Sequence, residues 1–368
     1  MKKSILTALL LLCMLIFTAC KEETKNTENV PNKEQSGTQE TTAGPNETND
    51  REDSEPGDQD QANQGTQNPA QKQEIRIAAL KGPTAIGMVK IMEDTSKETA
   101  ANDYQFTIAG TADEISVGLM KGDFDIAAIP CNLASVLYQK TEGAIKLAGI
   151  NTLGVLYIAE TGDTIHSVED LKGKTIYSTG LGTTPQYTLN YLLKAYGLDP
   201  DKDVTIEYKT EATEVAAILS EGKEAIALLP QPYVTTVMLN NEKLRIALDV
   251  AEEWNKVSTD GSSVVTGVVV VRTEFLESNP EAFEAFMTEY AVSAAYVNEN
   301  IEEAASLVEK YDIFKAGPMK KAIPYCNITL LQGEEMKQKV SGYLNALYEQ
   351  EPKAVGGKLP SEDFYYLP

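Results

Sequence analysis

Polar residues that could bind a small molecule follow several short apolar segments of the chain. In open α/β units, ligands bind beyond the carboxyl ends of the strands, so the turns after these segments form the candidate binding site. These turns cover residues 81–85, 110–113, 130–132, 180–186 and 231–233. The candidate ligand-binding residues are Lys81, Thr84, Ala85, Thr111, Cys131, Asn132, Thr183, Thr184, Tyr187, Gln231 and Tyr233.

The residue types in these turns suit the recognition of an anion or a polar oxygen. Thr84, Thr183 and Thr184 stand where helices are expected to begin. Free backbone N–H groups and hydroxyls at such positions can hold an oxygen atom. Plain helix capping is the simpler explanation for each threonine alone, whereas similar turns facing one cleft from two sides favour binding. The amides of Asn132 and Gln231 follow apolar runs that end in proline, and they can also contact a ligand.

Three aromatic residues have two possible roles. Tyr187, Tyr233 and Trp254 could stack on a ligand, or they could belong to the hydrophobic core.

Catalytic and metal-binding chemistry has little support in the sequence. His166 is the single histidine, which excludes sites with several histidine ligands, and it lies in a polar loop. Gly180 and Gly182 resemble the start of a dinucleotide-binding fingerprint, but Pro185 occupies the place of the third glycine. We therefore expect no enzyme activity, no metal and no cofactor.

The charge of the chain disfavours nucleic acid as a partner. The 368 residues contain 32 Lys+Arg and 55 Asp+Glu, for a formal net charge of −23. Phosphate contacts need clustered basic residues. With 42% hydrophobic residues the chain is globular on average, and it is long enough for two domains.

The first 73 residues are not expected to join the fold. Residues 1–20 have a positive start, an apolar run and small residues before Cys20, which is typical of a lipoprotein signal peptide. Cys20 is the expected lipidation site, although Phe17 replaces the usual leucine; the alternative is an ordinary secreted protein with a chance cysteine. Residues 21–73 carry 12 acids and 5 bases, and their composition predicts a disordered acidic tether.

The remainder repeats one α/β plan at an offset of 100 residues, which predicts two lobes of like topology. Identities at this offset include Gly82/Gly182, Thr84/Thr184, Leu119/Leu219, Gly122/Gly222, Ile126/Ile226 and Pro130/Pro230. Helices through Leu119 and Leu219 are expected to end at Gly122 and Gly222. The apolar segments 147–159 and 264–270 are candidate links, so the expected lobes are 74–160 with 264–368, and 161–263. A chain that passes twice between two lobes forms a two-segment hinge, with a cleft between the lobes.

Two cysteines remain beyond the signal region. Cys131 and Cys326 could form a disulfide in an exported protein, or they could be small buried hydrophobic residues.

Several segments resemble solute-binding lipoproteins of ABC importers, in the nitrate/sulfonate/taurine branch that includes binders of thiamine-pyrimidine precursors. The resemblance covers about residues 74–350. The matching segments are 168–176 (VEDLKGKTI), 196–200 with 203–204, 222–235 with its LPQP at 229–232, and 279–283 (NPEAF).

The resemblance implies a type II periplasmic-binding-protein fold, in which two α/β lobes joined by a two-segment hinge close on one small polar molecule or anion. Sulfonates, nitrate and pyrimidine-like molecules are the implied ligand classes, and a membrane permease is the implied partner. The protein would act as a monomer, lipid-anchored on the outer face of a bacterial membrane. Gln231 departs from the family, where glutamate often precedes the proline, and the Cys-rich motif of pyrimidine-synthase relatives is missing. The alternatives are an extracellular sensor or adhesion lipoprotein, or an enzyme on the same fold.

Overall fold

The computed structural model describes residues 72–221 and 223–368. The expected signal peptide, Cys20, residues 21–71 of the expected tether and the expected helix end at Gly222 lie outside these ranges. Within the described ranges, no helix combines the length and the apolar character that crossing a membrane requires.

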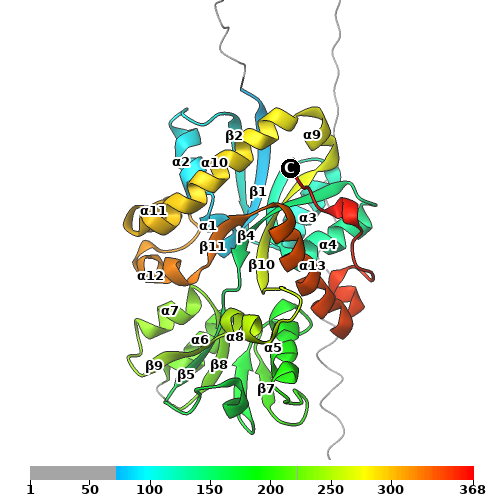
Figure 1. The fold of residues 1–368 in the computed structure, drawn as a ribbon. Helices are drawn as coiled ribbons and strands as arrows, with labels where there is room; N and C mark the ends of the chain where they lie inside the picture. Colours follow the sequence, from blue (N-terminus) through cyan, green and yellow to red (C-terminus); the bar gives the residue numbers. More distant parts are fainter. Residues whose placement is uncertain (1–71, 222) are drawn as a thin grey trace, which may run out of the picture. The chain divides into compact units, whose positions relative to one another are not determined.

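A six-stranded sheet organises the first lobe (Figure 1). Its strands, in spatial order, are β11 (Ile328–Leu331), β4 (Ile145–Leu153), β10 (Val265–Arg272), β3 (Ile126–Pro130), β1 (Glu74–Leu80) and β2 (Asp103–Ala109). β1 runs parallel to β2 and β3, whereas β10 is antiparallel to β3 and β4.

A five-stranded sheet organises the second lobe with the same central plan. Its order is β7 (Thr205–Tyr208), β6 (Thr175–Ser178), β8 (Ile226–Pro230), β5 (Leu156–Thr161) and β9 (Leu244–Asp249). β6 lies between two parallel partners as β1 does, and β5 is antiparallel to β8 as β10 is to β3. β3 and β8 begin and end 100 residues apart, so the predicted α/β repeat is confirmed.

Helices cover both faces of the first sheet, because its strands are apolar on both sides. Ile77 and Ala79 pack into one buried cluster and Ala78 into the other, as alternation along a strand requires. The buried stripe predicted for the long helix after Asn279 is confirmed, since Phe283 and Phe286 are fully buried there. The helices of this lobe are α1 (Pro83–Ile86), α2 (Val89–Ser96), α3 (Ala112–Lys121), α4 (Cys131–Lys140), α9 (Thr273–Ser278), α10 (Pro280–Glu299), α11 (Ile301–Lys310), α12 (Ala316–Ala322), α13 (Gly333–Gln350), η2 (Ile323–Tyr325), η3 (Pro352–Val355) and η4 (Glu362–Phe364).

Two smaller clusters fill the second lobe, one on each face of its sheet. Ile158 and Leu228 point to one cluster, and Ala159 and Leu229 point to the other. The helices here are η1 (Val168–Leu171), α5 (Thr184–Ala195), α6 (Ala212–Ser220), α7 (Tyr233–Met238) and α8 (Val250–Val257).

The chain leaves the first sheet earlier than the sequence analysis expected. β4 ends at Leu153 and β5 begins at Leu156 in the second sheet, so the change of sheet precedes the expected boundary at residue 160. The hydropathy of the sequence does not show this change of sheet, because both strands are buried. A Cβ atom on Gly154 would lie 2.7 Å from the Ala251 side chain, so the link needs glycine for its close approach to α8.

Candidate functional site

Most of the predicted binding residues follow strands of the two sheets. Thr84 and Ala85 follow β1, Cys131 and Asn132 follow β3, Thr183, Thr184 and Tyr187 follow β6, and Gln231 and Tyr233 follow β8. These are the carboxyl ends of strands in both lobes, as the α/β pattern predicts.

One hydrogen bond joins the first turns of two helices from opposite lobes. The Thr184 hydroxyl, in α5, donates to Oδ1 of Asn132, in α4, at 3.2 Å. Nδ2 of Asn132 donates to the carbonyl oxygen of Ala354 at 3.2 Å, which orients the amide. Two helix N-termini with their free N–H groups therefore face the same region.

Aromatic residues make a second set of contacts between the lobes. Tyr233 meets Phe314, which precedes α12, edge to face at 6.1 Å between ring centroids. The Tyr157 hydroxyl of β5 donates to the Tyr325 carbonyl oxygen at 2.8 Å, and the two rings are 6.2 Å apart. The sequence analysis missed Tyr157, Phe314 and Tyr325. Tyr157 lies inside an apolar strand, and no periodicity predicts which distant helix approaches it.

Gln231 lies at the junction of the two lobes. Its backbone N–H donates to the Val155 carbonyl oxygen, within the link between β4 and β5, at 2.9 Å. Its side chain is buried, and Oε1 accepts from the Thr235 N–H at 3.3 Å.

Three other predicted residues make hydrogen bonds within their own turns, which give each of them a structural role. Thr111 is exposed and caps α3 by accepting from the Glu114 N–H at 3.4 Å. The Thr183 hydroxyl donates to the Gly180 carbonyl oxygen at 2.8 Å, and the Tyr187 hydroxyl donates to the Gly182 carbonyl oxygen at 3.1 Å. Each of these bonds lies within its own turn.

The turn after β1 is held by the core beneath it. The Thr84 hydroxyl donates to the Leu80 carbonyl oxygen at 2.7 Å, and Ala85 is buried. α1 has only four residues, so its carbonyl groups need partners outside the helix. Nδ2 of Asn151 donates to the Thr84 carbonyl oxygen at 3.0 Å, and the Ser293 hydroxyl donates to the Gly87 carbonyl oxygen at 2.6 Å.

Trp254 belongs to the core, which decides between the two roles considered for it. It is fully buried, stacks on Tyr191 of α5 at 3.9 Å and meets Tyr343 of α13 edge to face at 5.5 Å. The Tyr343 hydroxyl also lies 3.0 Å from the Thr188 hydroxyl, so α13 of the first lobe packs against α5 and α8 of the second.

Both remaining cysteines are free and buried, so the structure contains no disulfide between them. Cys131 and Cys326 lie in different hydrophobic clusters, and burial raises the pKa of both thiols. They are the small core residues that the sequence analysis held open as one alternative.

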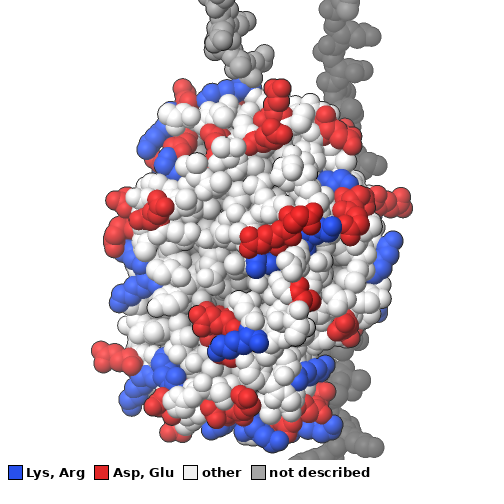
Figure 2. Space-filling view, viewed as in Figure 1, with Lys and Arg blue, Asp and Glu red and all other residues white. Residues whose placement is uncertain are grey.

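The three arginines that the structure describes form ion pairs with acidic residues that are not among the predicted binding residues. Arg76 pairs with Asp125, Arg245 with Glu160, and Arg272 with Glu274. Lys81, the basic residue among the candidates, pairs with Asp312 at 3.0 Å in the same lobe. In Figure 2, charged side chains of both signs are interspersed near the edges of the visible face, and the area over β11 and α1 is largely uncharged.

An acidic group lies beside the aromatic contacts. Asp249 pairs with Tyr157 across β9 and β5, and it caps α8 by accepting from the Ala251 N–H at 2.8 Å. Burial raises the pKa of the Asp249 carboxyl, against the opposing effect of the backbone N–H groups that it accepts from. Burial and the nearby Asp249 charge together raise the pKa of Tyr157.

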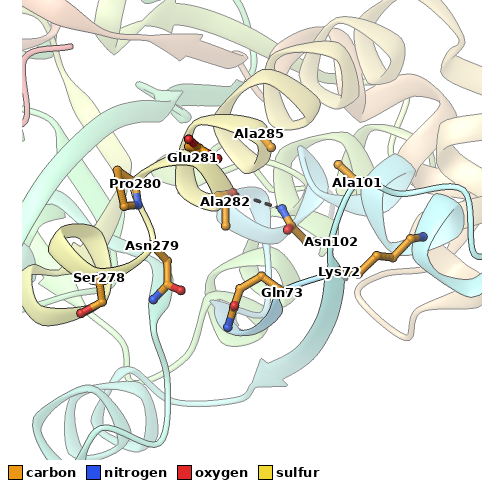
Figure 3. Close-up of a pocket in the computed structure, with 10 residues that line it drawn as sticks. All are labelled: Lys72, Gln73, Ala101, Asn102, Ser278, Asn279, Pro280, Glu281, Ala282 and Ala285. Carbon is orange, nitrogen blue, oxygen red and sulfur yellow. Dashed lines mark hydrogen bonds between the residues drawn. The ribbon is translucent and has the colours of Figure 1, made fainter. Parts of the chain in front are cut away.

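Three surface cavities lie away from this region. Figure 3 shows one of about 480 Å³ beside the amino ends of β1 and β2, where Gln73, Asn102 and Asn279 line its wall. A second lies beside Tyr138, and a third beside Glu160 in the second lobe. None of the three is lined by a residue predicted to bind ligand.

Comparison with known proteins identifies the fold. An ABC transporter structure from Parabacteroides distasonis matches with a TM-score of 0.68 and 27% identity, over 80% of this chain and 99% of the other. The periplasmic aliphatic sulphonate binding protein SsuA from Escherichia coli matches with a TM-score of 0.64 and 16% identity, over 80% and 92%. The Bacillus subtilis protein YtlA is 21% identical over 268 residues, which are 62% of this chain and 78% of YtlA.

The chain has the type II periplasmic binding protein fold. The family model described as "NMT1/THI5 like" matches residues 142–304, which include β4 and β10 of the first sheet and all of the second sheet. The resemblance to solute-binding proteins of ABC importers that the sequence indicated is thereby confirmed.

Proposed function

We propose that this protein is the substrate-binding lipoprotein of an ABC importer, and that it holds a small polar molecule between its lobes and delivers it to a permease. The observation that carries the proposal is the Thr184–Asn132 hydrogen bond, because it brings the N-terminal turns of two helices from opposite lobes together. The matches to solute-binding proteins support the same function.

Closure of the lobes around the ligand is the proposed mechanism of capture. The two sides of the lobe junction differ in a way that supports it. On the α13 side, Trp254 and Tyr343 are fully buried, which suits a fixed pivot. On the α7 and α12 side, Tyr325 is exposed and Tyr233 and Phe314 are half-buried, which suits an opening edge.

A binding role is proposed in preference to an enzymatic one. His166, the single histidine, is exposed on the second lobe, and its Nε2 lies 3.8 Å from Oδ1 of Asp163. Within residues 72–221 and 223–368, no group of three or more metal-ligating side chains is present.

A screen for small molecules that raise the Tm of the protein tests the function directly. We expect at least one member of a panel of sulfonates, nitrate, pyrimidines and amino acids to raise the Tm of the protein, since a ligand that binds the folded state stabilises it. Thr184→Val should weaken binding of that molecule about tenfold, because the hydroxyl that meets Asn132 is lost.

The matched control for this prediction is Thr205→Val, on the exposed edge of β7, which should leave binding unchanged. A panel without any stabilising member would refute the proposed function. Equal affinity in Thr184→Val and the native protein would refute only the assignment of the site.

Lipid anchoring through Cys20 is proposed from the sequence. We expect radiolabelled palmitate to enter the protein in a bacterial host and Cys20→Ser to abolish the label, because the cysteine thiol is the acylated group. Cys326→Ser, at a buried cysteine, is the control that should keep the label. Labelling of Cys20→Ser at the native level would contradict the proposal.

A further inference from the structure

The cavity of Figure 3 lies at the amino ends of β1 and β2, whereas the predicted binding turns follow the carboxyl ends of strands. Its wall consists of residues 72–73, which lead into β1, residues 101–102, which lead into β2, and residues 278–282 with Ala285 at the start of α10. The cavity is therefore separate from the proposed site between the lobes.

Asn102 holds a fixed hydrogen-bond acceptor on this wall. It is 7% exposed, and its Nδ2 donates to the Ala282 carbonyl oxygen at 3.1 Å and to the Tyr104 hydroxyl at 3.2 Å. Because a carbonyl oxygen can only accept, the nitrogen end of the amide faces Ala282, as Figure 3 shows. Both N–H groups of the amide are thereby used, and Oδ1 has no hydrogen-bond partner within residues 72–221 and 223–368.

The first turn of α10 provides donors on the same wall. The first N–H groups of a helix have no partner within the helix. Pro280 has no N–H group, and the side chain of Asn279 does not cap the helix. In the part of the chain that the structure describes, the backbone N–H groups of Glu281 and Ala282 therefore have no hydrogen-bond acceptor.

The charges around the cavity are balanced. Lys72 and Glu281 are the charged residues of its wall, and Nζ of Lys72 donates to the Glu98 carbonyl oxygen at 2.9 Å. Behind the wall, the Glu289 carboxylate accepts from the Ala101 N–H at 2.8 Å. An anion at the start of α10 would meet these carboxylates, and a cation would meet the positive end of the helix dipole. The cavity thus favours an uncharged ligand.

We infer that this cavity is a second binding site, and that it takes an uncharged molecule with an amide group. The C=O and N–H of a trans amide point in opposite directions. Figure 3 shows Asn279 and Pro280 on one side of the cavity and Asn102 on the other. An amide that lies across the cavity accepts from the N–H groups at the start of α10 and donates to Oδ1 of Asn102, so each unpaired group gains a partner.

Two kinds of molecule share this chemistry, namely amino sugars with an acetamido group and short peptides. The cavity of about 480 Å³ is in the range of small-molecule sites and has room for either. The inference does not rest on the proposed function, since it concerns the opposite end of the first sheet from the interlobe site.

The test measures the binding of four probes to the full-length protein in detergent, by calorimetry and by the shift in Tm. N-acetylglucosamine and N-acetylalanine methylamide carry the amide, and glucose and acetate are the matched probes without it. We expect at least one amide probe to bind and to raise the Tm, and neither matched probe to do so. Binding of one amide probe alone identifies the sugar or the peptide as the source, and binding of both supports the shared chemistry.

Ala285→Phe distinguishes this cavity from the interlobe site. Substitution of Asn102 would also break its bond to Ala282, whereas a phenylalanine at the half-buried Ala285 fills the cavity without removal of a hydrogen bond. We expect Ala285→Phe to lose the binding of the amide probe and to keep the Tm response to the molecule that the ligand screen identifies. Ala295→Phe makes the same change at an exposed position further along α10 and should keep both responses. Thr184→Val, at the interlobe site, should keep the binding of the amide probe.

The Tm of each variant without probe shows that it is folded. Absence of binding by both amide probes would overturn the inference, as would equal binding of glucose or acetate. Equal binding of an amide probe by Ala285→Phe and the native protein would also overturn it, because the probe would then lie elsewhere. Weaker binding in Thr184→Val would place the probe between the lobes, with the same consequence. In all these cases the proposed function stands, since it fails only if no molecule of the ligand screen binds.

Discussion

Trp254→Ala is expected to lower the free energy of unfolding by about 3–5 kcal/mol, the largest effect of any substitution considered for this chain. Trp254 is fully buried, and it contacts Tyr191 in its own lobe and Tyr343 in the other. Its removal leaves a cavity at the place where α13 joins the second lobe. Chemical denaturation followed by far-ultraviolet circular dichroism measures this loss, since Trp254 is the single tryptophan and its fluorescence disappears with it.

Two other variants serve as comparisons for the free energy of unfolding of Trp254→Ala. Trp254→Phe retains an aromatic ring and should cost less than Trp254→Ala. Val292→Ala, at a residue that is 62% exposed on α10, should change the free energy of unfolding by no more than about 0.5 kcal/mol. A Trp254→Ala protein as stable as the Val292→Ala control would show that the junction of α13 with α5 and α8 contributes nothing to the fold.

Gly267→Ala should both destabilise the protein and weaken ligand binding. A Cβ atom at Gly267 would lie 2.4 Å from Oδ1 of Asn151 and 2.4 Å from Cγ2 of Thr84, distances that neighbouring atoms cannot keep. Because Nδ2 of Asn151 holds the Thr84 carbonyl oxygen, relief of this clash displaces the turn after β1. We expect a loss of about 1–3 kcal/mol in the free energy of unfolding, together with weaker binding of whichever molecule the ligand screen identifies.

Gly110→Ala is the matched control for Gly267→Ala. No atom lies within 4 Å of a Cβ built on Gly110, and its backbone is outside the left-handed region. Both substitutions reduce the entropy of the unfolded chain equally, so the difference between them isolates the clash at Gly267. Equal stability of the two variants would mean that Asn151 and Thr84 can move without cost. Unchanged ligand binding by Gly267→Ala would show that the turn after β1 is not part of the binding site.

The parts of the fold that the sequence predicted are those with a local signal. β3 and β8 end at Pro130 and Pro230, where proline closes each apolar run. The stripe of apolar residues along α10 follows the helical period, so its buried face could be predicted without knowledge of its partner. The turns with candidate ligand-binding residues were found in the same way, because they interrupt the apolar runs.

The change of sheet between β4 and β5 had no such signal. Both strands are buried on both faces, so the sequence reads as one apolar segment, and only the close approach of Gly154 to Ala251 and Val264 distinguishes the link. Tyr157 was overlooked for the same reason, since an aromatic residue within a buried strand resembles any core residue.

The sequence by itself determined the α/β repeat, the strand ends and the polar turns that follow them, because these features depend on periodicity and on residues adjacent in the chain. Only the tertiary structure decided that Thr184 meets Asn132 and that Trp254 is a core residue shared by α5, α8 and α13. These facts depend on contacts between segments far apart in the chain, and hydrophobic burial, which drives those contacts, is non-directional and does not specify the partner.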